Sequence, residues 1–362
     1  MLYNLLYPLH AVIPFLNLFR YITFRASMAA LTAFVVSLLL GPVIINTMKR
    51  LQIGEKVIKD DSKRLDELHR KKQGTPTMGG ILILLAVSLS VFLWADIFNK
   101  YIIIAMFSTL WLGITGFIDD YLKQIKKMSK GLTVTAKFTS QVILGIILGI
   151  VLFSDPQTTT RLDIPFLKDV SINLGIFYIL FTVLVITGSS NAVNLTDGLD
   201  GLAIGCVIMA SIAFSVLSYV SGNIKLSEYL LIPYIKGSGE LTVFCSAVFG
   251  AGLGFLWFNC YPAAIFMGDV GALSLGGALG TVALLIKKEL LLVIVGGIFV
   301  MEALSVILQV VSFRLTKKRI FKIAPLHHHF QFLEWPENKV IVRFWIIAAL
   351  LALLTIVTLK LR

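Results

Sequence analysis

The chain has 362 residues, of which 57% are apolar or aromatic and 14% are charged, whereas ordinary soluble domains have about 45–50% and about 25%. This composition excludes a soluble globular domain, a disordered chain and a small disulfide-stapled scaffold. Long apolar runs such as 132–154 and 241–258 match the roughly 20 residues that a helix needs to cross a bilayer core. We therefore expect a polytopic membrane protein.

The apolar runs predict an all-α fold, a single integral membrane domain over 1–362 with about ten transmembrane helices. Residues 1–23 are expected to form an interfacial segment before the first span. The run 261–286 holds Asp269 and five glycines, so its first third is expected to be a loop or a re-entrant segment. The predicted spans are 25–46, 76–95, 101–118, 132–154, 174–190, 199–220, 241–258, 261–286, 289–312 and 341–360.

The basic residues are distributed unevenly between the two sides of the predicted bundle. The formal net charge is +12, and the loops after the odd-numbered spans hold 20 of the 32 Lys and Arg. Because basic residues are retained in cytoplasmic loops, these loops are predicted to be cytoplasmic and both termini periplasmic. The net charge thus describes orientation, and no nucleic-acid partner is expected. Cys206, Cys245 and Cys260 lack metal-ligand spacing and are expected to be packing residues.

Acidic residues interrupt apolar sequence on the predicted cytoplasmic side. Asp119 and Asp120 end the third span, Asp197 and Asp200 follow the fifth, and Asp269 follows the seventh. Because these span ends meet at one membrane face, the pattern predicts a catalytic site at the inner surface of the membrane.

The adjacent carboxylates of Asp119 and Asp120 are hard oxygen ligands, and Mg²⁺ is usually bound through one or two carboxylates together with substrate phosphates. Two neighbouring carboxylates also repel each other unless a positive charge lies beside them. The alternative interpretation is a solvated helix end, because Lys123, Lys126 and Lys127 follow within two turns.

The stretch NAVNLTDGLDGLA carries a denser polar pattern. On a helix, Asn194, Asp197 and Asp200 would lie within a 120° arc of one face, so that an amide and two carboxylates would point the same way. The alternative is a turn before the next span in which Asp200 or Thr196 caps the helix.

Asp269 lies in FNCYPAAIFMGDVGALSLGG, between two glycines at the mouth of an apolar segment. A lone acid costs about 2.5–3.5 kcal/mol at mid-bilayer unless it is paired or bound to a metal. We interpret it as a functional acid, and the alternative is a surface loop residue.

The run APLHHHF places His327, His328 and His329 in a basic loop. Imidazoles can bind metals or, when protonated, phosphate. Consecutive residues cannot all face one ion, so a zinc site of three histidines is not expected, and recognition of a polyphosphate fits the surrounding Lys and Arg better.

Two other polar groups carry weaker signals. Lys71 and Lys72 precede a Gly-Thr-Pro-Thr turn at the start of the second span, where a basic cluster can equally be topogenic or bind anionic lipid. Glu302 and Gln309 are seven residues apart and therefore lie on one face of the ninth span. We expect them to face the bundle, either in the site or in an interhelical hydrogen bond.

The motifs IDDYLK, NAVNLTDGLDGLA, FMGDVGALSLGG and PLHHHFQ, in this order and spacing, resemble the polyprenyl-phosphate N-acetylhexosamine-1-phosphate transferase superfamily. The histidine triplet and KKQGTPTMGG make the chain most similar to its phospho-N-acetylmuramoyl-pentapeptide-transferase family, over essentially the whole length. The resemblance implies an Mg²⁺-dependent enzyme of peptidoglycan synthesis in the bacterial inner membrane. Its substrates would be UDP-N-acetylmuramoyl-pentapeptide and undecaprenyl phosphate, and its products lipid I and UMP. The resemblance also implies ten spans, periplasmic termini, a bent ninth span and a homodimer.

The resemblance also assigns roles to residues at matching positions. Asp119, Asp120, Asp269 and His328 would be catalytic, with Asp269 and Asp120 holding Mg²⁺. The substrate-binding residues would be Lys72, Thr77, Lys137, Asn191, Asn194, Asp197, Gly198, Asp200, Asn259, Phe266, Gln309, His327 and His329.

Alternatives to this function and its mechanism stay open at this point. A related enzyme could transfer another UDP-N-acetylhexosamine, and an ion-coupled secondary transporter could use acids along its transport path. A transporter should show acids at the midplane on broken helices and internal repeats, but Glu302 is the only acid expected near mid-depth. For the transferase, direct attack of the lipid phosphate is our preferred hypothesis, and the alternative is a covalent intermediate on Asp119, Asp120 or Asp269.

Overall fold

The protein is described by a computed structural model that covers residues 1–51, 53–54, 72–126, 128, 131–156, 158–167 and 170–360. The helices are α1 (Leu2–Leu6), α2 (Ile22–Arg50), α4 (Gly80–Trp94), α5 (Lys100–Gln124), α6 (Val134–Ser154), α7 (Phe177–Thr196), α8 (Leu202–Ser221), α9 (Ile224–Tyr229), α10 (Leu241–Asn259), α11 (Gly268–Leu285), α12 (Glu289–Val295), α13 (Gly297–Thr316), α14 (Leu326–Gln331) and α15 (Glu337–Val357). Short 3-10 helices lie at Tyr7–Ala11, Pro14–Arg20, Ser238–Glu240 and Thr358–Lys360, and β1 (Arg161–Asp163) pairs antiparallel with β2 (Ser171–Asn173).

Within these residues, nine helices are long and apolar enough to cross a membrane, and the 15-residue α4 is a further, shorter apolar helix. The prediction of an all-α polytopic bundle is thereby confirmed. The run 261–286 is helical only from Gly268 onward, as expected from its loop-like first third. The run 289–312 is divided into α12 and α13 at Gly296, so the ninth predicted span is interrupted there.

The most buried helix is α11, in which every residue from Val270 to Leu285 is buried. Glycines on α11 and on its neighbours allow this close packing. A Cβ at Gly116 of α5 would lie 2.2 Å from the backbone oxygen of Asp269, and one on Gly276 of α11 would lie 2.5 Å from the backbone oxygen of Ser189. The contact at Gly116 brings the following turn of α5, which carries the paired acids, beside the start of α11.

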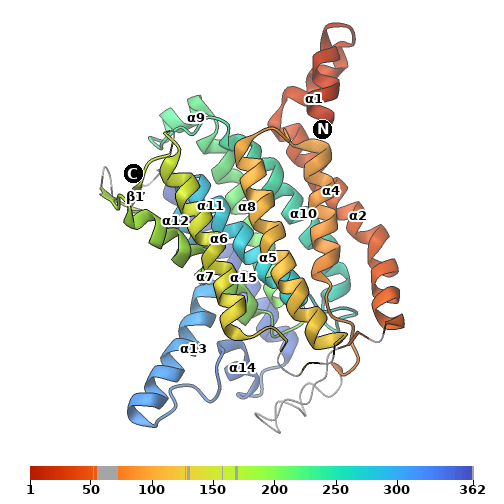
Figure 1. The fold of residues 1–362 in the computed structure, drawn as a ribbon, viewed down its shortest axis with the longest axis vertical. Helices are drawn as coiled ribbons and strands as arrows, with labels where there is room; N and C mark the ends of the chain where they lie inside the picture. The colour runs from red at the N-terminus through yellow and green to blue at the C-terminus, as the bar shows by residue number, and fades with distance from the viewer. Residues whose placement is uncertain are drawn as a thin grey trace.

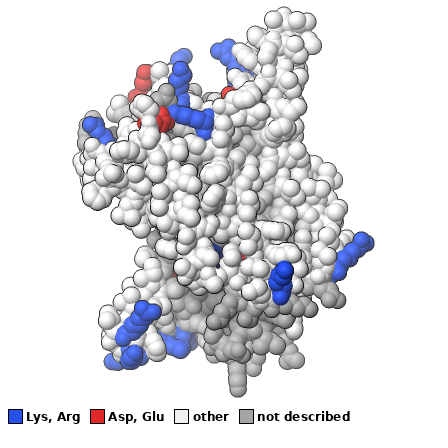
Figure 2. Space-filling model, viewed as in Figure 1, with Lys and Arg blue, Asp and Glu red and all other residues white. Residues whose placement is uncertain are grey.

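The two chain termini lie in the same half of the molecule, and α14 lies at the other end (Figure 1). The lower part of α13 leans away from the other helices (Figure 1), its last turn carries Arg314, and Lys317 follows directly after it. Lys and Arg gather toward the two ends of the molecule, and the broad band between them is almost free of charged side chains (Figure 2). This distribution is the one expected of a bundle that crosses a bilayer.

The end of the bundle that holds the termini contains two buried charge clusters. Both guanidinium nitrogens NH1 and NH2 of Arg25 in α2 donate to the Glu240 carboxylate, at 2.7 and 2.6 Å. Lys287 donates to the Tyr178 hydroxyl and to Glu289, each at 2.7 Å, and that hydroxyl donates to Glu289 at 2.6 Å. Each cluster pairs one carboxylate with one cation.

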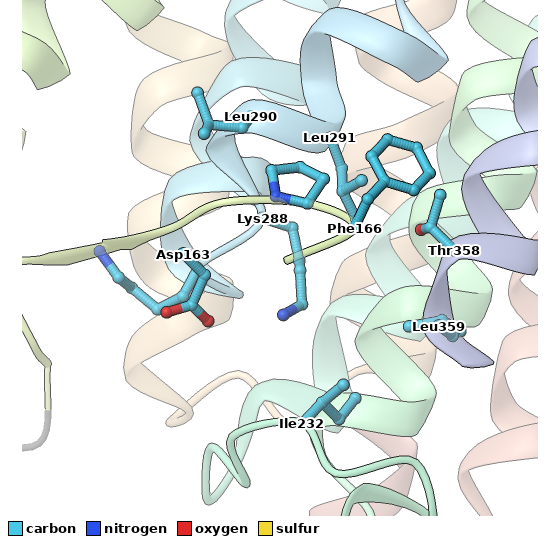
Figure 3. Close-up of a pocket in the computed structure, with 10 residues that line it drawn as sticks. Asp163, Phe166, Ile232, Lys288, Leu290, Leu291, Thr358 and Leu359 are labelled. Atoms are coloured by element: carbon cyan, nitrogen blue, oxygen red, sulfur yellow. The ribbon is translucent and has the colours of Figure 1, made fainter. Parts of the chain in front are cut away.

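A small cavity lies close to Lys287 and is lined by Asp163, Lys288 and apolar side chains from α12 and the C-terminal 3-10 helix (Figure 3). Its volume of about 20 Å³ is enough for roughly one water molecule. The cavity is therefore too small for a phosphorylated substrate, and it lies at the end of the molecule opposite α14.

Candidate active site

The carboxylate of Asp269, in the first turn of α11, is contacted by side chains from three other helices. Its Oδ2 accepts hydrogen bonds from Lys137 of α6 at 2.7 Å and from Lys123 of α5 at 3.0 Å. Its Oδ1 accepts one from the amide of Asn194 of α7 at 2.6 Å. Residues up to 146 positions apart thus meet at one carboxylate.

The paired acids of α5 lie against the same site. Oδ2 of Asp119 accepts a hydrogen bond from Lys123 at 2.7 Å, and its Oδ1 accepts one from the backbone N–H of Leu132 at 2.7 Å. Oδ2 of Asp120 accepts from the backbone N–H of Val270 at 3.2 Å. Both carboxylates are buried, at 2% and 5% exposure, so the solvated helix end is not what the structure contains.

Among the described residues of the site, three carboxylates lie beside two lysines. Asp119 and Asp269 share Lys123 and Lys137, whereas the carboxylate of Asp120 is bonded by the backbone N–H of Val270. Among the described residues, no group of three His, Cys, Asp or Glu side chains could hold a metal ion alone. The donor set nevertheless fits Mg²⁺, which commonly takes one or two carboxylates and completes its shell with water and substrate phosphates.

The loop between α7 and α8 corrects the expectation for NAVNLTDGLDGLA. Helix α7 ends at Thr196, and α8 begins only at Leu202, so Asp197 and Asp200 do not share a helical face with Asn194. Residue Gly201, immediately before α8, has a φ of +77°, a left-handed conformation that suits glycine. The capping alternative is also wrong, because Gly201 is the N-cap of α8 and no side chain caps it.

Asp200 instead belongs to a buried ionic network that joins four segments. Its Oδ1 accepts a hydrogen bond from Lys72 at 2.6 Å, and its Oδ2 accepts one from the backbone N–H of Ala263 at 2.9 Å. Glu337, at the start of α15, accepts from the amine of Lys72 and from the backbone N–H of Asp200. Lys71 and the rest of 55–71 lie outside the described residues.

Three residues assigned to the donor cleft lie at the turn that leads into α11. Asn259 is buried and bonds only backbone here, accepting from the N–H of Gly201 at 3.0 Å and donating to the carbonyl of Ile265 at 2.7 Å. Phe266 pairs through its backbone with Pro76 and Gly79. A Cβ on Gly268 would lie 3.1 Å from the hydroxyl oxygen of Thr77 and 2.6 Å from Oδ2 of Asp120, so Thr77 lies against the start of α11 and close to this acid.

Two other assigned residues, Asn191 of α7 and Gln309 of α13, form hydrogen bonds with partners other than Asp269. Asn191 donates to Gln141 at 2.6 Å, one turn before Asn194 on α7. Gln309 accepts from the backbone N–H groups of Ile320 and Phe321, at 3.1 and 3.0 Å, and donates to the carbonyl of Phe321. The amide of Gln309 therefore fixes the segment after α13.

The histidine triplet forms one turn of α14, and its three rings meet different partners. His327 is buried and faces Glu302 of α13. Nδ1 of His328 lies 2.9 Å from the side-chain oxygen of Gln331, and Nδ1 of His329 accepts from the backbone N–H of Lys322 at 3.1 Å. The three rings thus have three different partners, as expected for consecutive residues that cannot all face one ion.

Two charged partners of the site were not assigned from the sequence. Lys123 follows Asp119 by one helical turn, a spacing that could have indicated the ion pair. Glu337 gave no comparable signal, because its partner Lys72 is 265 residues away in the chain.

The amino-acid sequence of the chain matches two family patterns and several known proteins. The pattern of glycosyl transferase family 4 matches residues 102–287, and signature 1 of phospho-N-acetylmuramoyl-pentapeptide-transferases matches residues 72–84. The chain is 53% identical over 363 residues to the phospho-N-acetylmuramoyl-pentapeptide-transferase of Desulforapulum autotrophicum, with 100% of both chains covered. The chain belongs to the phospho-N-acetylmuramoyl-pentapeptide-transferase family.

Other phospho-N-acetylmuramoyl-pentapeptide-transferases match over the same extent. That of Desulfatibacillum aliphaticivorans is 55% identical, with 100% of both chains covered, and that of Methylacidiphilum infernorum is 53% identical over 99% of this chain and 100% of its own. The transferase signature begins at Lys72 and includes Thr77, and the family 4 pattern spans the acids from Asp119 to Asp269. The histidine triplet lies beyond both patterns but within the full-length matches.

Proposed function

We propose that the protein transfers phospho-N-acetylmuramoyl-pentapeptide from its UDP-linked donor to undecaprenyl phosphate, giving lipid I and UMP. The observation that carries this proposal is the meeting of Asp119, Asp120 and Asp269 with Lys123 and Lys137 at one end of a membrane bundle. The full-length relatives, all phospho-N-acetylmuramoyl-pentapeptide-transferases, support the choice of donor and acceptor. They also weigh against an ion-coupled transporter.

We propose that Asp269 and Asp120 hold Mg²⁺ when the donor is bound. The metal would neutralise charge that develops on the diphosphate, as metal ions do in other phosphoryl transfers. The Lys123 amine is 37% exposed and shared between two carboxylates, so it can turn from the acids to a phosphate. The charge of Lys137 lies on the same side of Asp269 and would stabilise the same anion.

A groove in the bundle surface offers a path for the polyprenyl chain. It has a volume of about 330 Å³ and is formed by α7, α11, α12 and α13 with almost entirely apolar lining. Ala192 and Val193 line it, and the next residue, Asn194, donates to Asp269. A lipid lying in this groove would therefore bring its phosphate to the acids.

The proposed reaction is an in-line displacement at the β-phosphorus of the donor. The acceptor is a phosphate monoester whose second pKa is about 6, so at pH 7 it is already largely ionised and needs no strong base. One of its oxygens forms a bond to the β-phosphorus as the bond to the bridging oxygen breaks, and UMP leaves with that electron pair. The lysines position and neutralise the phosphates.

We further propose that the site faces the cytoplasm in the bacterial inner membrane, with both termini on the opposite side. The charge distribution between loops supports this orientation, as does the position of both termini in the half of the molecule away from α14. The homodimer implied by the family resemblance stays a prediction, to be checked by light scattering on the purified protein.

The test of function is release of UMP by the purified full-length protein in detergent, where transport is impossible. We expect release from UDP-N-acetylmuramoyl-pentapeptide only when undecaprenyl phosphate is present, with loss of release in EDTA and recovery on adding Mg²⁺. Turnover only with UDP-N-acetylglucosamine would show a different donor. No release from either donor would contradict the proposal.

An exchange experiment separates the two mechanisms. Enzyme given donor and labelled UMP without lipid should leave the label in UMP, because direct displacement needs the acceptor. Incorporation of label into the UDP-sugar would contradict direct displacement and favour a covalent intermediate.

A further inference from the structure

Glu302, in the middle of α13, is fully buried and faces the histidine turn of α14. Its Oε1 accepts a hydrogen bond from the backbone N–H of His327 at 3.1 Å. Its Oε2 lies 3.2 Å from Nδ1 of the same residue. Among the described residues, neither that oxygen nor either ring nitrogen of His327 has a hydrogen-bond partner of good geometry, so the 3.2 Å approach is the one polar contact that Oε2 and Nδ1 have.

The backbone contact places a carboxylate at the start of α14. The N-cap residue of this helix, Pro325, provides no side-chain hydrogen bond to the first turn. The first N–H groups of a helix need partners from outside the helix, and a negative charge is favourable there. Glu302 meets this need from another helix and so fastens α14 to α13.

The other face of the His327 ring lies on the loop between α7 and α8. A Cβ at Gly198 would lie 2.2 Å from Nε2 of His327, so the ring lies directly against the backbone of this residue. Gly198 is between Asp197 and Asp200, and Asp200 binds Lys72. The His327 ring therefore lies between the buried carboxylate of Glu302 and the loop 197–201.

We propose that Glu302 is a positioning residue that fixes the tautomer and orientation of His327 and thereby the spacing between α14 and the loop 197–201. A carboxylate can only accept hydrogen bonds, so the Nδ1 atom that faces it carries the proton. The ring is then held with Nε2 toward Gly198. This inference rests on the proposed function, because that loop is where we expect the donor to bind.

Glu302→Gln is the sharpest variant, because it keeps the shape of the side chain. Its single oxygen can still accept from the backbone N–H of His327, but its amide N–H₂ then faces Nδ1 and requires an acceptor there. The variant should therefore move the ring proton to Nε2 and leave the fold intact. Ser305→Ala is the matched control, because this buried serine on the next turn of α13 donates to the carbonyl of Glu302 and not to α14.

The experiment combines ¹⁵N spectra of histidine-labelled full-length protein with steady-state kinetics. His327 is assigned by the signal that disappears in His327→Asn. We expect the Nδ1–H pattern in the unchanged protein and in Ser305→Ala, and its loss in Glu302→Gln with a fall of about tenfold or more in kcat/KM for the donor, as for other residues that orient a functional imidazole. Melting temperatures should be similar.

Three outcomes would overturn the inference: an Nε2–H pattern in the unchanged protein, an unchanged ¹⁵N pattern in Glu302→Gln, or full activity in that variant despite a changed pattern. Failure of the unchanged protein to release UMP would contradict the proposed function, whereas the spectrum tests the pairing without any substrate.

Discussion

The two ends of the bundle both contain buried ions, but they balance them differently. At the end with the termini, Arg25 and Lys287 each face one carboxylate, and their side chains are 2% and 8% exposed. At the other end, Lys123 and Lys137 are shared between Asp119 and Asp269, and their side chains are 37% and 18% exposed. The carboxylate of Asp120 lies beside them and is bonded by a backbone N–H. We call the first end closed, because each of these cations pairs with one carboxylate and is buried. We call the second end open, because its carboxylates outnumber its lysines among the described residues and both lysines are partly exposed.

We interpret this difference as one between ion pairs that stabilise the bundle and ion pairs of the candidate active site. In a buried pair of one cation and one carboxylate, separating the two charges is costly, and removing one residue leaves a buried charge without compensation. A cluster with excess carboxylates and accessible amines can accept a metal ion or release a lysine to a phosphate at small cost. Buried charge occurs at both ends, so it does not by itself point to the candidate active site. What distinguishes that site is the number of carboxylates relative to lysines among the described residues.

The largest expected effect is on activity at the open end. Asp269→Asn removes the charge shared by Lys123 and Lys137, and we expect kcat for UMP release to fall about 10³-fold, the loss seen when a single preorganised electrostatic group is removed. Its melting temperature should change little, because the amide can still pair with Asn194. Activity above a tenth of the unchanged protein would contradict the role of this acid.

The opposite result is expected at the closed end. Glu240→Gln leaves Arg25 buried without a countercharge, which should lower the free energy of unfolding by roughly 3–5 kcal/mol. Activity per folded molecule should stay the same, because this pair lies at the other end of the bundle. Thermal unfolding in detergent and kinetics on the folded fraction measure the two quantities. A stable variant with low activity would reverse the comparison.

A smaller effect is expected where the open end is packed most tightly. Gly198→Ala would place its Cβ 2.2 Å from Nε2 of His327, and such overpacking costs about 1–3 kcal/mol. We expect kcat/KM for the donor to fall about tenfold. In Gly188→Ala, the stability control, the new Cβ meets no atom within 4 Å, so it should not destabilise the helix. Equal stability losses in both variants would contradict the steric argument.

The smallest effect should come from an ion pair that is neither buried nor functional. Lys100 and Asp155 pair at 2.6 Å, with side chains 41% and 20% exposed. Because exposed pairs contribute about 1 kcal/mol or less, Lys100→Gln should scarcely change the melting temperature or the activity. A loss as large as that of Glu240→Gln would mean that exposure does not distinguish the two kinds of pair.

The sequence alone predicted a polytopic helical bundle, because the length of an apolar run and the free energy of its burial are local properties. It predicted about ten spans, and the described residues contain nine helices long enough to cross a membrane and the shorter apolar α4. It also predicted that the first third of 261–286 is not helical, as the start of α11 at Gly268 confirms. It singled out Asp119, Asp120 and Asp269 because acids in apolar sequence need partners, and the structure brings these three together. The arrangement of NAVNLTDGLDGLA was predicted wrongly. A spacing of three residues places side chains on one helical face only if the helix continues, and α7 ends at Thr196, before Asp197 and Asp200.

Only the tertiary structure decided which charges meet. Lys137 reaches Asp269, Lys72 reaches Glu337 and His327 reaches Glu302 across separations of 132, 265 and 25 residues. No local pattern encodes such pairs, because they depend on how closely glycine-bearing helices such as α5 and α11 pack. The sequence thus determined a membrane bundle with acids at one face, and the packing of that bundle decided how its cations divide between a closed end and an open one.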